Sequence, residues 1–534
     1  MNTPSAPPGS AWEPLRHPVF RALWLAGSVG FIGLWMQNVA AAWTMTSLTT
    51  SPLMVALIQT AATLPAFLLG LPGGVLADQM DRRRLLIATN SWTLLALGTL
   101  SLLTFTDSVG AWSLLALTFA VGAGSAMQGP AWQATSSDVL PRSLVHAGLS
   151  MNAVSANMAR AVGPALAGIL LAWIGSGMVF AINACCYLWV VVVLLRWEGP
   201  PPRSSDLPPE GLFAGMRSAL RYVRHSPALA TLYGRCLVVY FSASAMWALL
   251  PVVARDQLGF GAGGYGLLMA GLGIGAVIGS LVLVKLQHRF GPNRLMQMAN
   301  VFAALAMACM GYVTNHVIIV ITMVVAGIAW IGIAAVPNMA IQTGVATWVR
   351  ARAIAMFFLT FQVGMASGSV VWGAVATQFG TPTALAAAAS MVVIILALGR
   401  RFPINLGTDA ELTPSLHRLE PVVEIEPEME DGPVAVQLAY RIDPARRSDF
   451  ARAAYALGSI RQRDGASSWR LYRDLEEPDR YVERFIVGSW GEYLRQRTRA
   501  TITDRQAEER ALSFHVGDTP PRMRHFITEP ASTD

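Results

Sequence analysis

Long apolar segments follow one another along the first 400 residues of the chain, separated by short polar stretches. A helix needs about 20 mostly apolar residues to cross the roughly 30 Å of bilayer hydrocarbon. Unpaired backbone groups are too costly in lipid, so only helices and closed barrels can cross it. These segments have helical length and lack the alternation of barrel strands, and they predict an all-α polytopic membrane protein. We expect twelve transmembrane helices, at residues 20–45, 52–77, 84–105, 110–135, 146–172, 176–196, 229–254, 263–286, 294–313, 316–340, 352–378 and 382–400.

The last hundred residues follow a different pattern, rich in Arg, Asp and Glu, which is typical of a water-soluble domain. Apolar residues alternate in some stretches and recur at helical intervals in others. The expected elements are a strand at 434–442, a helix at 445–462, strands at 469–475 and 481–490, a helix at 493–514 and a strand at 522–528. This βαββαβ order predicts a small α+β domain of the ferredoxin-like type.

The chain therefore divides into two groups of six spans and a soluble tail. A polar linker, with a helical pattern over Leu212–Val223 that predicts an interfacial amphipathic helix, separates the groups. An acidic linker containing prolines leads to the tail. The expected domains are an N-terminal six-helix half at 1–196, the first linker at 197–228, a C-terminal six-helix half at 229–401, the second linker at 402–432 and the tail at 433–534.

Charge supports the membrane assignment and gives an orientation. The chain is 54% hydrophobic and only 13% charged, far outside the range of soluble proteins. Arginines fall almost entirely in loops on one side, from Arg82-Arg83-Arg84 to Arg400-Arg401, and this excess predicts that both termini are cytoplasmic. The net charge of +7 follows from this bias and does not indicate binding of nucleic acid.

The sequence offers no catalytic constellation, metal site or cofactor motif. All the cysteines (Cys185, Cys186, Cys236 and Cys309) lie inside apolar segments without a pairing pattern. We therefore expect no enzyme activity, no metal and no cofactor.

The loop after the second span reads Gly73-Gly74-Val75-Leu76-Ala77-Asp78-Gln79-Met80-Asp81-Arg82-Arg83-Arg84. It resembles the cytoplasmic loop motif of the major facilitator superfamily. The resemblance implies a latch between the two halves, with Gly74, Asp78, Arg82 and Arg83 as its residues here. This chain departs from the motif at Gln79, where a cation is usual, and at Asp81, where a glycine is usual. The alternative interpretation is a positively charged turn.

The fifth span contains Gly163-Pro164 followed by Gly168, which resembles a motif of the exporters in that superfamily. Gly163 and Pro164 would bend the helix, and Gly168 would permit close packing. The alternative is a kink that carries no information about transport direction.

Together with Gly129-Pro130-Ala131-Trp132-Gln133 and Pro337-Asn338-Met339-Ala340-Ile341-Gln342, these stretches resemble the branch of the superfamily that includes the enterobactin exporter and related secretion transporters. The resemblance covers residues 12–400 and implies alternating access around a central cavity. The tail resembles an extension carried by many members of that branch. Its topology is also similar to that of small monooxygenase-type domains.

Arg160 is the most informative single residue, because a charge within a span is costly and is usually kept for a partner or a cavity. No carboxylate lies in any span to neutralise it. Either an anionic substrate pairs with it, or helix carbonyls and Asn157 satisfy it. The other residues expected to line a substrate cavity are Gln37, Asn38, Asn152, Trp247, Asn338, Gln342 and Gln362, whereas Trp330 and Trp372 are expected to pack.

We thus expect a secondary active transporter of the inner (cytoplasmic) membrane that exports a small organic molecule: a siderophore, another secondary metabolite or a drug. Its partners would be that substrate and the lipid bilayer. The resemblance implies antiport with protons, but the spans contain no carboxylate for that coupling, and the residues leave the coupling ion open. For the tail we favour regulation or self-association. Two alternatives are an importer of the same fold and a membrane-anchored protein whose monooxygenase-like tail carries the activity.

Overall fold

The structure is a computed structural model that describes residues 12–199, 220, 222–399, 423, 427–517, 519–521 and 523–529. The chain forms two compact units. The first comprises residues 1–208, 235–337 and 358–403, and the second comprises 209–234, 338–357 and 404–534. This division differs from the sequence-based domains, because the tail groups with the start of the seventh span and with the connection between the tenth and eleventh.

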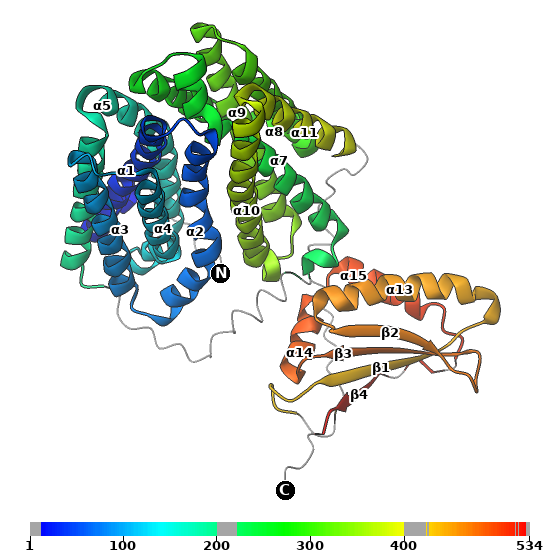
Figure 1. Ribbon diagram of the computed structural model, residues 1–534. Helices are drawn as coiled ribbons and strands as arrows, with labels where there is room; N and C mark the ends of the chain where they lie inside the picture. Colours follow the sequence, from blue (N-terminus) through cyan, green and yellow to red (C-terminus); the bar gives the residue numbers. More distant parts are fainter. Residues whose placement is uncertain are drawn as a thin grey trace. The chain divides into compact units, whose positions relative to one another are not determined.

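The membrane part consists of long helices joined by short turns (Figure 1). Gly175, with φ 76° and ψ 172°, separates two helices within α5, and Gly291, with φ 72° and ψ 163°, does so within α8. A positive φ at these turns favours glycine, which has no Cβ to clash. The helices are α1 (Pro18–Leu48), α2 (Pro52–Gln79), α3 (Arg82–Phe105), α4 (Ala111–Val139), α5 (Val145–Arg196), α7 (Pro227–Val252), α8 (Ala262–Tyr312), α9 (His316–Gly344), α10 (Thr347–Phe379) and α11 (Thr381–Gly399).

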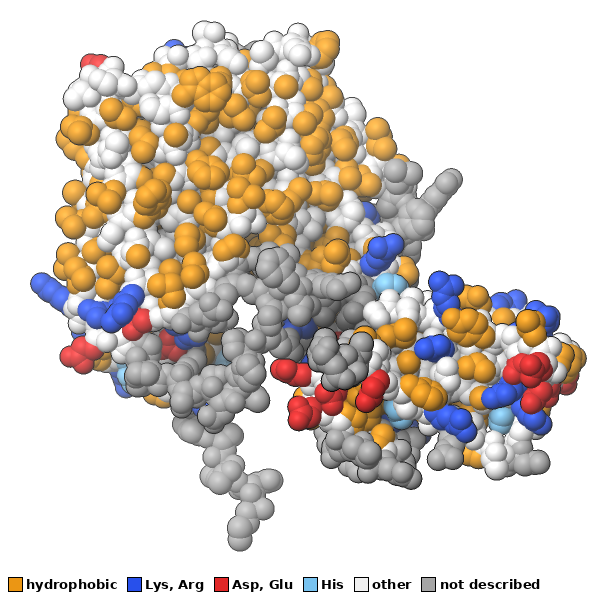
Figure 2. All heavy atoms as spheres, turned by 60° about the horizontal axis from the view of Figure 1, so that its bottom comes forward, with side chains coloured by type: hydrophobic (Ala, Val, Ile, Leu, Met, Phe, Trp, Pro, Cys, Tyr) orange, Lys and Arg blue, Asp and Glu red, His pale blue; other side chains and the backbone are white. Residues whose placement is uncertain are grey.

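Ten stretches of the described helices are long and apolar enough to cross a membrane. One of them, α5, contains two segments on either side of Gly175, and Thr381–Ala397 adds a shorter apolar helix, so the described helices hold twelve apolar segments. The predicted spans are thereby confirmed. Large apolar side chains remain exposed on these helices, as expected where lipid surrounds them: Trp173 is 83% exposed and Leu281 is 73% exposed. Figure 2 shows this apolar surface, with charged side chains gathered at one end.

Local chemistry sets where several helices begin. Proline occupies the first turn of α1 and α2, where its missing N–H would be unpaired in any case. The side chain of Asp81 accepts a hydrogen bond from the Arg84 backbone N–H at 3.0 Å and so caps α3. Asp81, one of the two residues at which this loop departs from the superfamily motif, therefore has a structural role here.

The tail is a four-stranded antiparallel sheet with helices on one face (Figure 1). Its strand order is β2-β3-β1-β4, which matches the predicted ferredoxin-like topology. Phe450, Phe485 and Tyr493 lie in the core between sheet and helices. The elements are β1 (Val434–Arg441), α13 (Arg447–Asp464), β2 (Ser468–Arg473), β3 (Arg480–Val487), α14 (Trp490–Arg499), α15 (Ile502–Leu512) and β4 (Met523–Ile527).

The helical region after β3 differs from the sequence-based expectation. The single helix predicted at 493–514 is wrong: the Thr501 side chain caps a new helix, α15, with a reciprocal bond from its own backbone N–H to Asp504. Of the amphipathic helix predicted at Leu212–Val223, only residues 220, 222 and 223 are described, and they are helical. Most of the acidic linker lies outside the described residues.

A buried charge network joins the helices of the tail to its sheet. Arg461 donates to Glu508 at 2.7 Å, and its Nε lies 3.7 Å from Glu483, whose side chain is 2% exposed. The Arg461 charge lowers the pKa of Glu508. Because the ionised form of Glu508 is favoured in the folded state, its contribution to stability is present above pH about 4.5 and is lost as the pH falls through the lowered pKa.

We therefore predict that Glu508→Gln destabilises the tail at neutral pH by about 1 kcal/mol, since solvent partly screens the pair that is lost. The difference between variant and parent should shrink as the pH falls below 4. Hydrogen exchange of α13 and α15 in the full-length protein measures both effects. An unchanged exchange rate at neutral pH would contradict this account.

Candidate transport site

A cation and a series of aromatic rings meet in the middle of the helical part. The Arg160 guanidinium on α5 lies over the Trp35 ring of α1, 5.7 Å from its centroid. From Trp35 the rings continue to Trp247 at 6.2 Å and from there to Trp330 at 5.1 Å. Phe361 of α10 follows, 6.1 Å from Trp330. We call Trp35, Arg160, Trp247, Trp330 and Phe361 the central cluster.

This cluster spans both groups of helices. Trp35 and Arg160 come from the N-terminal helices (α1–α5), and the other members come from the C-terminal helices (α7–α11). A bound molecule that contacts both ends of the cluster would therefore contact both groups. That position agrees with the expectation of a site between two halves.

The charge of Arg160 is only partly compensated by its surroundings. The closest hydrogen-bond partner among the described residues is Asn157 Oδ1 at 3.5 Å, the long limit for such a bond. The Trp35 ring adds a cation–π contact. No described carboxylate forms an ion pair with Arg160, so most of its donors remain available. Both sequence interpretations thus retain support: Asn157 does contact the guanidinium, and an anion would still find free donors.

Two further predicted residues carry polar groups that the described residues leave unpaired. Gln37 is 0% exposed, and neither atom of its amide has a hydrogen-bond partner. The indole N–H of Trp247 is buried and also lacks a partner. Unpaired buried polar groups are costly, which favours a ligand or water at this level of the helices. Asn38, next to Gln37, is half-buried.

The remaining candidates form hydrogen bonds to neighbouring helices or within their own helix. Asn152 donates to Ser136 Oγ at 2.8 Å and ties α5 to α4. Gln362 donates to the Thr63 carbonyl at 3.1 Å and ties α10 to α2. Gln342 donates to Asn338 Oδ1 at 3.1 Å within the last turns of α9, which belong to the second unit. The hydrogen-bond partners described for these residues are not members of the central cluster.

The described contacts between the two groups gather toward one end of the first unit, the end that carries Thr46, Leu53 and Gly175. There the Arg255 guanidinium donates to the Thr46 carbonyl, and Thr377 Oγ1 accepts from the Leu53 N–H at 3.0 Å. Toward mid-helix, Thr60 Oγ1 donates to the Ala366 carbonyl at 3.0 Å. We call this the closed end. The opposite end carries the arginine-containing loops.

Gly168 makes the closest of these contacts. A Cβ placed on Gly168 would collide with the backbone of Gly266, and one placed on Gly266 would collide with Gly168. The close packing predicted for Gly168 is therefore present, and it joins α5 to α8. Gly163 plays a similar part within the N-terminal helices, where a Cβ would lie 2.7 Å from the Cβ of Trp35. Backbone dihedrals stay helical through Pro164, so any bend there is gradual.

At the arginine-rich end, the motif arginines bind within the N-terminal helices. Arg82 donates to both carboxylate oxygens of Asp138, at 2.8 and 2.9 Å, and links α3 to α4. Arg83 donates to the carbonyls of Leu194 and Leu195 at the end of α5, at 3.1 and 2.7 Å. These bonds lie inside one group of helices, and a latch between the groups stays a prediction. The structure does not describe the side chain of Asp78.

The two glycines at the start of this loop differ in their surroundings. A Cβ on Gly74 would meet no atom within 4 Å, so Gly74 does not mediate a close approach. Its neighbour Gly73 does, because a Cβ there would lie 2.9 Å from the Cα of Met127 on α4. The motif identifies the region of the close contact but not the residue that makes it. Gly73 and Gly74 are adjacent on one helix and therefore point to different faces.

Several members of the cluster were missed or misjudged from the sequence. Trp35 and Phe361 were not singled out, and Trp330 was expected only to pack. Trp330 is indeed 6% exposed, yet its ring also links Trp247 to Phe361. No local pattern marks these rings, because they come from helices far apart in the chain.

Comparison with known proteins identifies the family. The model of a family described as transmembrane secretion effectors matches residues 9–533. The chain belongs to this family. The match includes the tail as well as the helices, so the soluble domain is a part of the family pattern.

Curated relatives of the secretion effector include enterobactin exporters. The exporter EntS of Escherichia coli O1:K1 is 27% identical over 399 residues, which cover 72% of this chain and 91% of the relative. EntS of Shigella flexneri is 27% identical over 397 residues, covering 72% and 90%. The secretion effector is thus a multi-pass membrane transporter for a small molecule, and not an enzyme.

Solved structures share its fold. A bacterial homologue of the human lysosomal transporter Spinster, inward-facing and unoccupied, matches with a TM-score of 0.58 at 16% identity, over 72% of this chain and 96% of that one. The nucleoside transporter NupG matches with a TM-score of 0.58 at 14% identity, over 72% and 98%. At these identities the likeness establishes the major facilitator fold alone.

Gly168→Ala should weaken the closed end, because the added methyl group meets backbone that cannot rotate away. Gly98→Ala is the matched control, since a Cβ on Gly98 would meet nothing within 4 Å. We predict a lower Tm in detergent and at least about fivefold slower transport for Gly168→Ala alone, from overpacking of about 1–3 kcal/mol. Equal behaviour of the two variants would contradict a tight contact at Gly168.

Proposed function

We propose that this secretion effector exports small anionic organic molecules that carry aromatic or other flat apolar groups. The observation that carries the proposal is the central cluster, in which Arg160 lies over Trp35 and has no carboxylate partner among the described residues. A guanidinium in a low-dielectric site attracts an anion more strongly than it would in water. The adjoining rings of Trp247, Trp330 and Phe361 offer apolar surface for stacking.

The direction of transport is inferred from three supports. The Gly163-Pro164 motif resembles that of exporters, the curated relatives are named as exporters of enterobactin, and the arginine bias favours a cytoplasmic position for the loops that carry it. With that orientation the closed end faces away from the cytoplasm. A substrate would enter from the arginine-rich end and reach Arg160 midway along α5. Some siderophores, other secondary metabolites and drugs combine an anionic group with aromatic or other flat apolar groups.

Export then requires the closed end to open. The contacts between Gly168 and Gly266 and between Thr60 and Ala366 would have to separate, while the loops at the opposite end close. Arg82 and Arg83 hold α3, α4 and the end of α5 together, so the N-terminal helices could move as one body. Protons are proposed as the coupling ion on the basis of the family resemblance alone. The described spans contain no paired carboxylate that would support this role from the structure.

Arg160→Ala should impair export of anionic substrates by at least about tenfold, the value of a lost charge-assisted hydrogen bond, and change export of neutral ones far less. Uptake into inside-out vesicles, compared for an anionic siderophore and for its neutral ester, measures both. Arg160→Lys, which keeps the charge, is the matched variant and should retain more activity toward the anion. Equal impairment of both substrates, or accumulation outside the vesicles, would contradict the proposal.

For the tail we propose a regulatory or self-association role. Deletion of Leu412–Asp534 should leave export measurable in the same vesicles, because the central cluster lies in the membrane part. Membrane insertion, measured by the yield of folded protein in detergent, serves as the control. Complete loss of export with normal insertion would place an essential step in the tail.

A further inference from the structure

The strand β2 lies at one edge of the tail sheet, with β3 on its inner side only. The Asp474 N–H donates to the Arg480 carbonyl at 2.9 Å, and ladder bonds alternate along an antiparallel strand. Residues of β2 that are an even number of positions away from Asp474 therefore bond to β3. By the same alternation, the backbone N–H and C=O groups of Trp469, Leu471 and Arg473 point away from the sheet. An edge of this kind can accept another strand.

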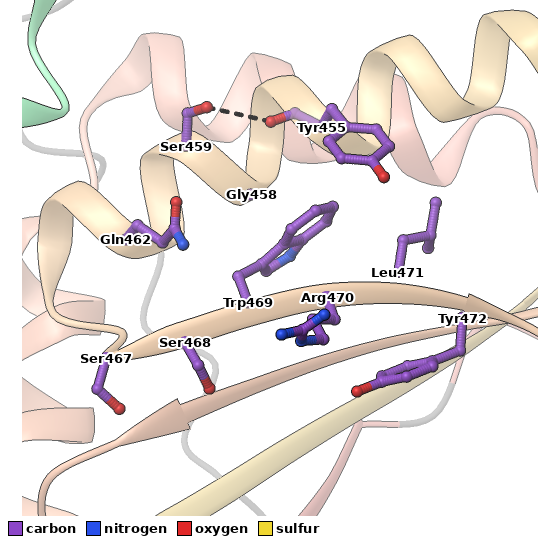
Figure 3. Close-up of a pocket in the computed structure, with 10 residues that line it drawn as sticks. All are labelled: Tyr455, Gly458, Ser459, Gln462, Ser467, Ser468, Trp469, Arg470, Leu471 and Tyr472. Atoms are coloured by element: carbon purple, nitrogen blue, oxygen red, sulfur yellow. Dashed lines mark hydrogen bonds between the residues drawn. The ribbon is translucent and has the colours of Figure 1, made fainter.

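A groove of about 550 Å³ runs along this edge, between β2 and α13 (Figure 3). The side chains of Trp469 and Leu471 point toward α13, and Ser468 and Tyr472 point to the other face of the sheet. From α13, Tyr455 closes one side, with its ring 5.2 Å from that of Trp469. The Tyr455 side chain is 62% exposed, so the groove is open to a partner.

The apolar part of the groove is formed by the Trp469 ring, which is held in place by its contacts. The Trp469 indole N–H donates to Glu483 Oε1 at 3.0 Å, which fixes the ring. The ring also packs against the backbone of α13 at Gly458, where a Cβ would collide with it. A fixed ring beside an unpaired strand edge loses little conformational entropy when a partner binds.

The other face of this edge is cationic and uncompensated. Arg470 on β2 lies directly opposite Arg484 on β3, and both side chains are exposed. Like charges at facing positions destabilise a sheet. Further along the sheet, Arg441 pairs with Glu477 and Arg480 with Asp474, but none of the described residues forms an ion pair with Arg470 or Arg484. An acidic group beside Arg470 would relieve this repulsion.

We propose that the tail binds an extended acidic peptide of a partner protein, which adds to β2 as a fifth strand. In such a strand successive side chains point to opposite faces. Its acidic residues would lie beside Arg470, and its apolar residues would enter the groove next to Trp469 and Tyr455. The partner therefore alternates acidic and apolar residues over the length of β2.

Charge favours this occupant over the obvious rivals. A second copy paired through β2 would bring its own Arg470, Arg473 and Arg484 against those of the first. Nucleic acid needs a strongly basic domain, and the tail carries nearly equal numbers of Arg and of acidic residues. Only an acidic strand satisfies the open backbone, the groove and the arginine pair together.

The test measures fluorescence anisotropy of a labelled synthetic peptide that alternates valine and glutamate, titrated with the full-length protein in detergent. A peptide that alternates valine and lysine is the control probe. We expect saturable binding of the acidic probe alone. Leu471→Pro removes an outward N–H from the edge, where proline is tolerated, and should weaken binding by at least about tenfold relative to Leu471→Ala, which loses the same side chain but keeps the N–H.

Arg470→Glu should abolish binding of the acidic probe and confer binding of the lysine probe. Absence of binding by the parent protein, equal binding of both probes, or equal affinities of Leu471→Pro and Leu471→Ala would overturn the proposal. So would concentration-dependent self-association of the parent, seen by light scattering and lost in Leu471→Pro, because the edge would then belong to a second copy.

Discussion

Contact of helix backbones at glycine holds the membrane part together. Lipid tails are as apolar as leucine, so the hydrophobic effect does little to drive helix against helix in a bilayer, and van der Waals packing takes its place. Such packing needs positions without a side chain. Gly168 and Gly266 supply them between the two groups of helices, and Gly275 and Gly327 do so between α8 and α9, where a Cβ would collide with backbone atoms. The contact between Gly168 and Gly266 lies at the closed end.

The high cost of charge in lipid organises the rest of the membrane part. Arginines gather at one end, where Arg82 and Arg83 find a carboxylate and helix carbonyls and stiffen the N-terminal helices. Arg160 is the exception at mid-helix, and its nearest neighbours are an amide and an indole ring. The arginines at the end have hydrogen-bond partners for a structural role, whereas the available donors of Arg160 at the centre support its proposed role in binding substrate.

The tail follows the rules of a water-soluble domain. Its core is apolar and aromatic, and its buried charges are paired, as Arg463 is with Asp464 and Asp504 at 2.8 and 2.6 Å. Against this background the unpaired Arg470 and Arg484 at an open strand edge are unusual. The family pattern extends over the tail, which agrees with a role in the work of the transporter rather than with a chance fusion.

The sequence by itself determined the number of spans and the βαββαβ order of the tail, because the length of an apolar segment and the alternation of apolar residues are local properties of the chain. It also identified Arg160 and Gly168, because a charge without a carboxylate partner stands out in a span, and because Gly168 closes the Gly163-Pro164 motif. Only the tertiary structure decided which aromatic rings join Arg160, that Gly73 rather than Gly74 approaches α4, and that Asn152 and Gln362 bond to neighbouring helices. Those outcomes depend on which faces of distant helices meet, and the 3.6-residue period of one helix says nothing about the rotation of its neighbour.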